Sequence, residues 1–164
     1  MEPGHQNKRI ITHLDATCGA SFKGAFNPDN DHFIFITDET GIEKVFNCLK
    51  AKIADQSSGC LTLVYALLND ETPPLFKAEL LSLEKRFSSL LQIHFVYCES
   101  KILSIKASIQ KTLEVILNSN INSQMHFFAC GNAEIIERVA QILHFLGVRG
   151  SQITTEKAIN QNNV

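Results

Sequence analysis

The stretch Phe33-Ile34-Phe35-Ile36-Thr37-Asp38-Glu39-Thr40-Gly41 decides the fold of this chain. Its first four residues are all apolar and either aromatic or β-branched, which is typical of a strand buried on both faces. The polar residues and the glycine that follow predict a turn, and apolar residues then recur at helical spacing over residues 41–54. A buried strand that leads through a short turn into an amphipathic helix is the first half of a βαβ unit.

The same alternation continues to the end of the chain. Short apolar runs predict strands at residues 33–36, 61–65, 93–97 and 125–129, with a shorter and more polar fifth strand at 151–155. Helical spacing predicts helices at residues 41–54, 74–88, 102–118 and 133–146. The order of these elements predicts an α/β fold in which helices cover both faces of a parallel sheet.

Composition places this fold in one soluble domain. The chain has 164 residues, of which 45% are hydrophobic and 20% are charged, and its net charge is −2. A near-neutral charge without a basic stripe argues against nucleic-acid binding. The longest apolar runs are far shorter than a membrane span and no signal peptide is visible, so we expect a cytoplasmic protein. We assign residues 32–158 to the domain, residues 1–31 to a loop-rich segment and residues 159–164 to a polar tail.

Cysteines and histidines do not form a metal-binding pattern. The cysteines are odd in number and have no CxxC spacing, so we expect reduced and mostly buried thiols. The histidines lack the spacing of known zinc motifs, and we predict no metal site. His94 and His126 hold similar positions in two predicted strands, where a sheet-face role is the simpler interpretation. The cysteines are Cys18, Cys48, Cys60, Cys98 and Cys130.

Ligands of an open parallel sheet bind at the carboxyl ends of its strands. Two turns there are candidates for a site: Asp38-Glu39-Thr40-Gly41 and Cys130-Gly131-Asn132. Hydroxyls, a glycine and the free N–H groups of a helix start favour a phosphate at the first turn, although its two carboxylates equally suit a solvated capping turn. At the second turn, a cysteine and a glycine allow a ligand to approach closely, and a buried thiol in a tight turn explains them equally well.

These turns, in this order, resemble the nucleotide-binding half of the ferredoxin-NADP reductase superfamily. There the first strand runs into G-G-T-G-x-x-P, the fourth into C-G-P, and the last ends in an E-x-F-like sequence, to which residues 153–157 are similar. Asp38-Glu39-Thr40 is most similar to the D-E-T-A turn of siderophore-interacting proteins, which are ferric-siderophore reductases. The resemblance covers residues 33–157, and its motifs are short.

The resemblance implies a Rossmann-like, doubly wound sheet of five strands in the order 3-2-1-4-5. It implies NADH or NADPH bound by the first turn and by Cys130, Gly131 and Asn132, with Cys130 and Glu156 as the catalytic residues beside the nicotinamide and the flavin. FAD would come from a partner domain, and a ferric siderophore would be the final acceptor. Glu99 follows the third strand, where a carboxylate favours NADH by accepting a ribose hydroxyl and repelling a 2′-phosphate.

The sequence also departs from the family pattern. Thr37 replaces the first motif glycine, Glu43 the motif proline and Ala158 the terminal aromatic residue, and the residues before the first strand are too few for a flavin-binding barrel. We therefore expect a module that needs a flavin-binding domain or subunit, with residues 1–31 at most a remnant of the link to one. Two alternatives stay open. One is an inactive binding or dimerisation module on the same fold. The other is a receiver-like domain that holds Mg²⁺ on Asp38 and Glu39.

Overall fold

The parallel sheet expected from the sequence is present. The computed structural model describes residues 30–54, 59–68, 73–98 and 102–158, and in these residues one sheet of five parallel strands has the order β3-β2-β1-β4-β5. The predicted α/β fold and its strand order are therefore confirmed. The strands are β1 (Asp31–Thr37), β2 (Cys60–Leu67), β3 (Leu91–Tyr97), β4 (Gln124–Gly131) and β5 (Ile153–Lys157).

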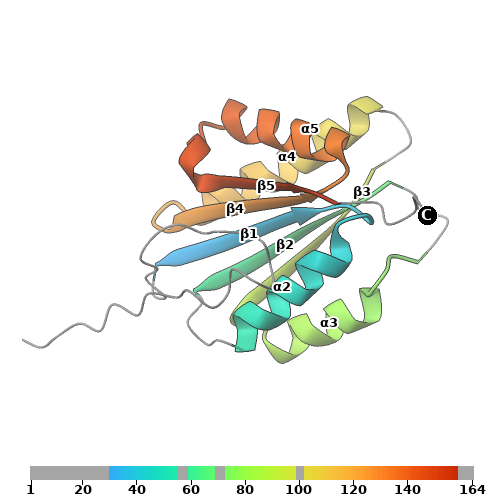
Figure 1. Ribbon diagram of the computed structural model, residues 1–164. Helices are drawn as coiled ribbons and strands as arrows, with labels where there is room; N and C mark the ends of the chain where they lie inside the picture. Colours follow the sequence, from blue (N-terminus) through green and yellow to red (C-terminus); the bar gives the residue numbers. More distant parts are fainter. Residues whose placement is uncertain (1–29, 55–58, 69–72, 99–101, 159–164) are drawn as a thin grey trace, which may run out of the picture.

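Helices cover both faces of this sheet and make three layers. Figure 1 shows one pair of helices on each face: α2 and α3 on one, α4 and α5 on the other. Each pair encloses its own apolar core against the sheet. The helices are α2 (Ile42–Ala54), α3 (Lys77–Arg86), α4 (Ile102–Ser119) and α5 (Ala133–Phe145), and a short 3-10 helix, Gly150–Gln152, precedes β5.

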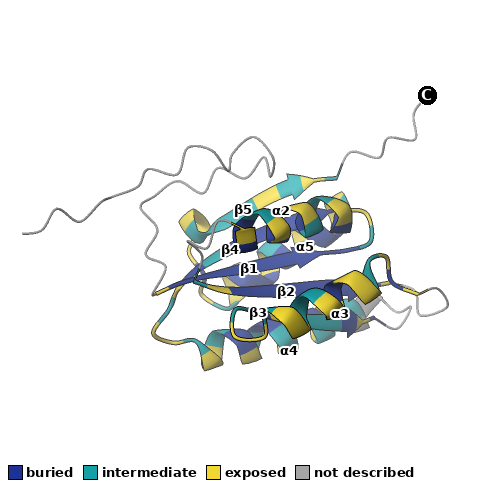
Figure 2. Cartoon of the chain, turned by 90° about the horizontal axis from the view of Figure 1, so that it is seen from below, coloured by how far each residue is buried: buried dark blue, intermediate teal, exposed yellow. Residues whose placement is uncertain are grey.

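The continuous apolar run of β1 is explained by this double coverage. Phe33 and Phe35 pack into the core under α2 and α3, whereas Ile34 and Ile36 pack into the core under α4 and α5. All four side chains are at most 1% exposed. Figure 2 shows the strands buried between helices whose outer faces are exposed. A strand at the centre of such a sheet has no face left for polar side chains, so period-2 alternation is absent.

Helix ends follow the sequence signals in one case and depart from them in another. The Asn132 side chain caps α5 by accepting from the Ile135 N–H at 2.9 Å, and Gly147 has the positive φ of 82° expected of a C′ glycine. By contrast, α3 begins at Lys77 and not at residue 74, because Phe76 has a φ of 58°. A residue in the left-handed region cannot belong to a right-handed helix, so the predicted start was wrong.

Cysteines and histidines only partly match expectation. Cys98 and Cys130 are buried free thiols and Cys60 is an exposed one, but Cys48 takes part in a disulfide bond, so the prediction of reduced cysteines is wrong there. His94 and His126 lie on β3 and β4, which β2 and β1 separate, so the two imidazoles do not meet.

Within the described ranges, no three His, Cys, Asp or Glu residues are arranged to hold a metal ion. In the same ranges, no helix is long and apolar enough to span a bilayer.

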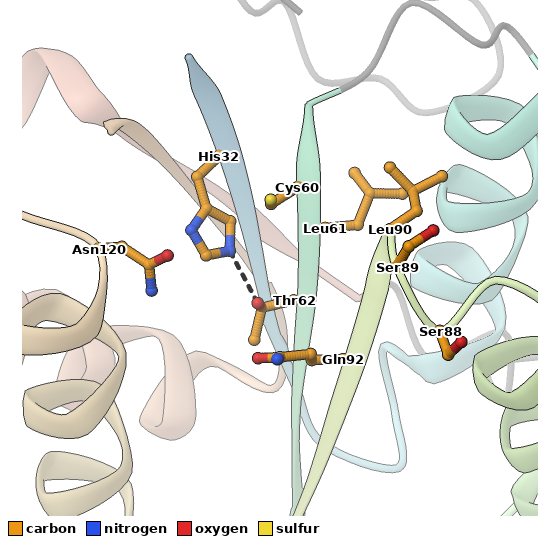
Figure 3. A pocket seen from close by; sticks show the side chains of 9 residues that line it. All are labelled: His32, Cys60, Leu61, Thr62, Ser88, Ser89, Leu90, Gln92 and Asn120. Carbon is orange, nitrogen blue, oxygen red and sulfur yellow. Dashed lines mark hydrogen bonds between the residues drawn. The ribbon is translucent and has the colours of Figure 1, made fainter. Parts of the chain in front are cut away.

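A cavity of about 70 Å³ lies at the amino ends of β1, β2 and β3, opposite the edge where ligands of such sheets bind. This volume suits one or two water molecules. Figure 3 shows the His32 imidazole bonded through Nε2 to the Thr62 hydroxyl at 2.7 Å, with Asn120 on its other side. The cavity is lined by His32, Cys60, Leu61, Thr62, Ser88, Ser89, Leu90, Gln92 and Asn120.

His32 makes the stability of the fold depend on pH. Burial lowers its pKa below the usual 6.5, an effect that Asn120 partly offsets. Below pH 6.5 the unfolded chain binds a proton that the folded chain resists, so the free energy of unfolding falls as the pH drops toward the folded-state pKa. We therefore expect the free energy of unfolding to be lower at pH 5.5 than at pH 7.5.

Urea unfolding of the wild type and of His32→Gln at both pH values tests this expectation. His32→Gln should lose most of the dependence on pH. His144→Gln, which changes an exposed histidine on α5, should keep it. An unchanged dependence in His32→Gln would contradict the assignment.

Candidate functional site

The carboxyl ends of three strands bring the predicted catalytic residues together. In the sheet register Thr37 of β1 pairs with Cys130 of β4, and Cys130 pairs in turn with Glu156 of β5. The chain order changes direction between β1 and β4, which is the switch point at which open α/β sheets bind ligands. Residues distant in sequence therefore form one candidate site at this edge.

The Asp38 carboxylate holds the first turn together. It follows β1 directly and is only 1% exposed. Its Oδ1 accepts from the backbone N–H of Thr40 at 2.9 Å, from the Thr40 hydroxyl at 2.6 Å and from the N–H of Gly41 at 3.1 Å. Asp38 thus satisfies the N–H groups that precede α2, and the Thr40 hydroxyl is turned toward the same carboxylate.

The second oxygen of the same carboxylate ties the two turns to each other. Asp38 Oδ2 accepts from the Asn132 N–H at 3.1 Å and from the Asn132 side-chain amide at 2.7 Å. Asn132 also caps α5, so one buried side chain joins the starts of α2 and α5. Both Asp38 oxygens are occupied by hydrogen-bond donors. This occupation disfavours the receiver-like interpretation, which needs a carboxylate open to Mg²⁺.

The protein itself occupies the space next to both glycines of the site. A Cβ on Gly41 would lie 2.4 Å from the backbone oxygen of Cys130, and a Cβ on Gly131 would lie 2.7 Å from Asp38 Oδ1. Each glycine is therefore required for the close approach of the two turns, whether or not a ligand binds. Gly131→Val would break the Asp38 network as well as any ligand contact, so substitution of this glycine is not a clean test of binding.

Cys130 is a buried, neutral thiol. Burial and the nearby Glu156 carboxylate raise its pKa to about 11, with Lys44 acting in the opposite direction and Asp38 adding to the rise. A thiol with this pKa is almost fully protonated at pH 7 and is a poor nucleophile. Cys130 is thus suited to contacting a bound group rather than to forming a covalent bond with it.

Glu156 is held by a cation that the sequence analysis did not select. Lys44, in the first turn of α2, forms an ion pair with Glu156 Oε1, and the side chains of both residues are about one-third exposed. Glu156 Oε2 is buried and has no hydrogen-bond partner among the described residues. A sequence signal for Lys44 did exist, because the helix dipole disfavours a cation in the first turn of a helix.

The structure says less about two other predicted site residues, Glu39 and Glu99. Glu39 is half-buried in the first turn, and its charge acts on Tyr65. Burial first, then Glu39 and Asp38, raise the pKa of Tyr65 to about 12, so that Tyr65 is neutral at physiological pH. Glu99, the predicted ribose partner, lies outside the described residues.

Comparison with known proteins shows the fold of the chain. No family model and no curated protein matches the sequence. The solved structures that resemble it include ferredoxin-NADP+ reductase from Plasmodium falciparum, with a TM-score of 0.63 and 24% identity over 78% of this chain. Another is the CS-b5R domains of human Ncb5or in an NAD+ form, with a TM-score of 0.61 and 17% identity over 81% of this chain.

A third similar structure is a ferredoxin-NADP+ reductase from Neisseria gonorrhoeae with bound FAD and NADP, with a TM-score of 0.54 and 19% identity over 80% of this chain. The chain shares the α/β fold found in these reductases. It corresponds to 53%, 39% and 58% of the three matched chains, so it spans roughly half their length or less.

Proposed function

We propose that this chain is the nucleotide-binding module of an NAD(P)H:flavin oxidoreductase and acts with a flavin-binding domain or subunit. The observation that carries the proposal is the meeting of Cys130, Gly131 and Glu156 at the switch point between β1 and β4. The resemblance of these residues to the C-G-P and E-x-F motifs supports it, as does the shared fold. The resemblance of Asp38-Glu39-Thr40 to the D-E-T-A turn supports a ferric siderophore as the acceptor.

The residues of the edge fit the nicotinamide end of such a cofactor. Glu156 Oε2 is a buried acceptor without a partner among the described residues, and it lies on the strand beside the neutral Cys130. An acceptor next to a neutral thiol suits an uncharged group that carries N–H donors, such as a carboxamide. When bound, the nicotinamide supplies the hydride that a flavin accepts, and the protein supplies binding and orientation.

In this proposal, each residue of the edge has a limited role. Glu156 accepts a hydrogen bond through Oε2, and the buried Cys130 excludes water from the same place. Asp38 and Asn132 keep the two turns in position. Preference for NADH over NADPH rests on Glu99, whose carboxylate would repel a 2′-phosphate.

Calorimetric titration with NADH and NADPH tests the proposal. The wild type should bind NADH with micromolar affinity, about −8 kcal/mol, and more tightly than NADPH. Glu156→Gln and Cys130→Ala should each weaken binding about tenfold. The first leaves the amide carbonyl on Lys44 and places a donating NH₂ group where Oε2 accepts, and the second removes the thiol contact to the nicotinamide. Glu134→Gln removes a carboxylate that pairs with Arg138 on the surface of α5, and it should leave the affinity unchanged.

One observation favours a second candidate function, a binding or dimerisation module without turnover. The N–H groups of Thr40 and Gly41 are donated to Asp38, so these amides are not free to hold a diphosphate. A folded wild-type chain that binds neither nucleotide would reject the oxidoreductase proposal and favour this second function.

A further inference from the structure

We infer that Lys44 is a positioning residue, which holds one oxygen of Glu156 so that the other faces the ligand as a hydrogen-bond acceptor. The inference rests on the function proposed above and adds a residue to its site. Lys44 belongs to α2, the helix that follows β1, and Glu156 belongs to β5, the strand beside β4, so their ion pair joins the two elements that flank the site. Lys44 therefore contacts Glu156 from a different element, 112 residues away in the sequence.

The two oxygens of Glu156 have different surroundings. Lys44 takes Oε1, whereas Oε2 is buried and has no hydrogen-bond partner among the described residues. A buried acceptor without a partner is unfavourable, so a carboxylate in free rotation would turn both oxygens toward water. The ion pair removes that freedom and leaves a single inward-facing acceptor.

Helix stability does not account for a lysine at this position. Lys44 is the third residue of α2, where the N–H ends of the first turn carry partial positive charge. The macrodipole opposes a cation there, whereas Glu43, the residue before, is a carboxylate that the dipole favours. The interaction that Lys44 gains in exchange is its contact with Glu156.

Charged groups from three elements around Cys130 agree with this role. The pKa of Cys130 on β4 is raised by Glu156 from β5 and by Asp38 from the end of β1, and it is lowered by Lys44 from α2. Glu156 and Asp38 add negative charge next to the thiol, and Lys44 is the cation that offsets it. Without Lys44, the carboxylate of Glu156 would keep its charge at this edge but lose the partner that fixes its direction.

A double-mutant cycle on NADH affinity tests the inference, because a residue that acts only through another has no effect once that residue is changed. Lys44→Met should weaken NADH binding about fivefold to tenfold. In a Glu156→Gln background the same substitution should change affinity less than twofold. Lys44→Arg restores a cation of similar reach and should bring affinity back to within about threefold of the wild type.

Lys157→Met is the matched control for overall charge. Lys157 is exposed and adjacent to Glu156 in β5, so its removal changes net charge beside the site by the same amount. An anionic ligand attracted only by net charge would respond equally to Lys157→Met and to Lys44→Met. That outcome, or additive effects of Lys44→Met and Glu156→Gln, overturns the inference and leaves the proposed function standing.

A second readout separates failure of the inference from failure of the proposed function. The same cycle measured by urea unfolding, without nucleotide, should show coupling of about twofold to fivefold in the unfolding constant, as for a partly exposed ion pair. If the wild type binds no nucleotide, the proposed function fails. In that case measurable coupling still supports Lys44 as the residue that fixes Glu156, and additivity overturns it.

Discussion

Asp38→Ala should lower the free energy of unfolding by about 3 to 5 kcal/mol, one of the two largest effects we expect from a single substitution in this chain. The carboxylate accepts five hydrogen bonds, and it is almost completely buried. Alanine would remove this acceptor from the donors of Thr40 and Asn132, and it would leave the Gly41 N–H only the longer 3.3 Å bond to the backbone oxygen of residue 38. Urea unfolding followed by circular dichroism measures the loss.

Two further variants define the cause of that loss. Asp38→Asn keeps the shape of the side chain but places an amide NH₂ opposite one set of donors, so it should lose about half as much. Glu39→Ala changes the neighbouring carboxylate, which is only half-buried, and should cost less than about 1 kcal/mol. A loss in Asp38→Ala no larger than in Glu39→Ala would show that the network does not hold the turns together.

Gly41→Ala should destabilise the fold by about 3 kcal/mol or more, although it adds a single methyl group. The new Cβ would lie 2.4 Å from the backbone oxygen and 2.6 Å from the backbone carbon of Cys130, and 2.6 Å from Thr37 Oγ1. Because two of these contacts are with backbone, no side-chain rotation relieves them. The start of α2 must move away from β4.

Gly150→Ala is the matched control for the loss of a glycine. A Cβ at Gly150 would meet its nearest heavy atom, in the His144 ring, at 3.8 Å, which is an ordinary contact. Its effect on stability should therefore stay within about 1 kcal/mol. Thermal unfolding of the two variants separates steric conflict from backbone entropy, and equal effects at both positions would contradict the close packing of α2 against β4.

The order and type of the elements could be predicted from the sequence because each obeys one strong pattern. Residues 33–36 have to be buried on both sides, and a strand between two helical layers is the arrangement that achieves this. Boundaries were harder to predict. The start of α3 depends on the left-handed backbone of Phe76, and β5 begins at Ile153 because the residues before it form a 3-10 helix. Neither feature follows from hydrophobic spacing.

The candidate site could be located from the sequence but its internal contacts could not be predicted. Strand ends in a parallel sheet share one edge, and the expected strand order puts the ends of β4 and β5 side by side, where Cys130 pairs with Glu156. Lys44 stands out in the sequence as a cation in the first turn of a helix, but its partner does not. Which residues pair with Asp38 and Lys44 depends on side-chain directions across elements about 90 to 110 residues apart in sequence, and hydrophobic spacing does not specify these directions. The glycines had an ambiguous signal, and the structure shows each packed against the protein itself.

The network around Asp38 also bears on the kinetics of recognition. Since one carboxylate already fastens the starts of α2 and α5 to each other, a ligand arriving at this edge meets a surface that needs little reorganisation. Little conformational entropy of these two turns is then lost on association. We therefore expect differences in affinity among ligands of this edge to appear mainly in how long each one stays bound.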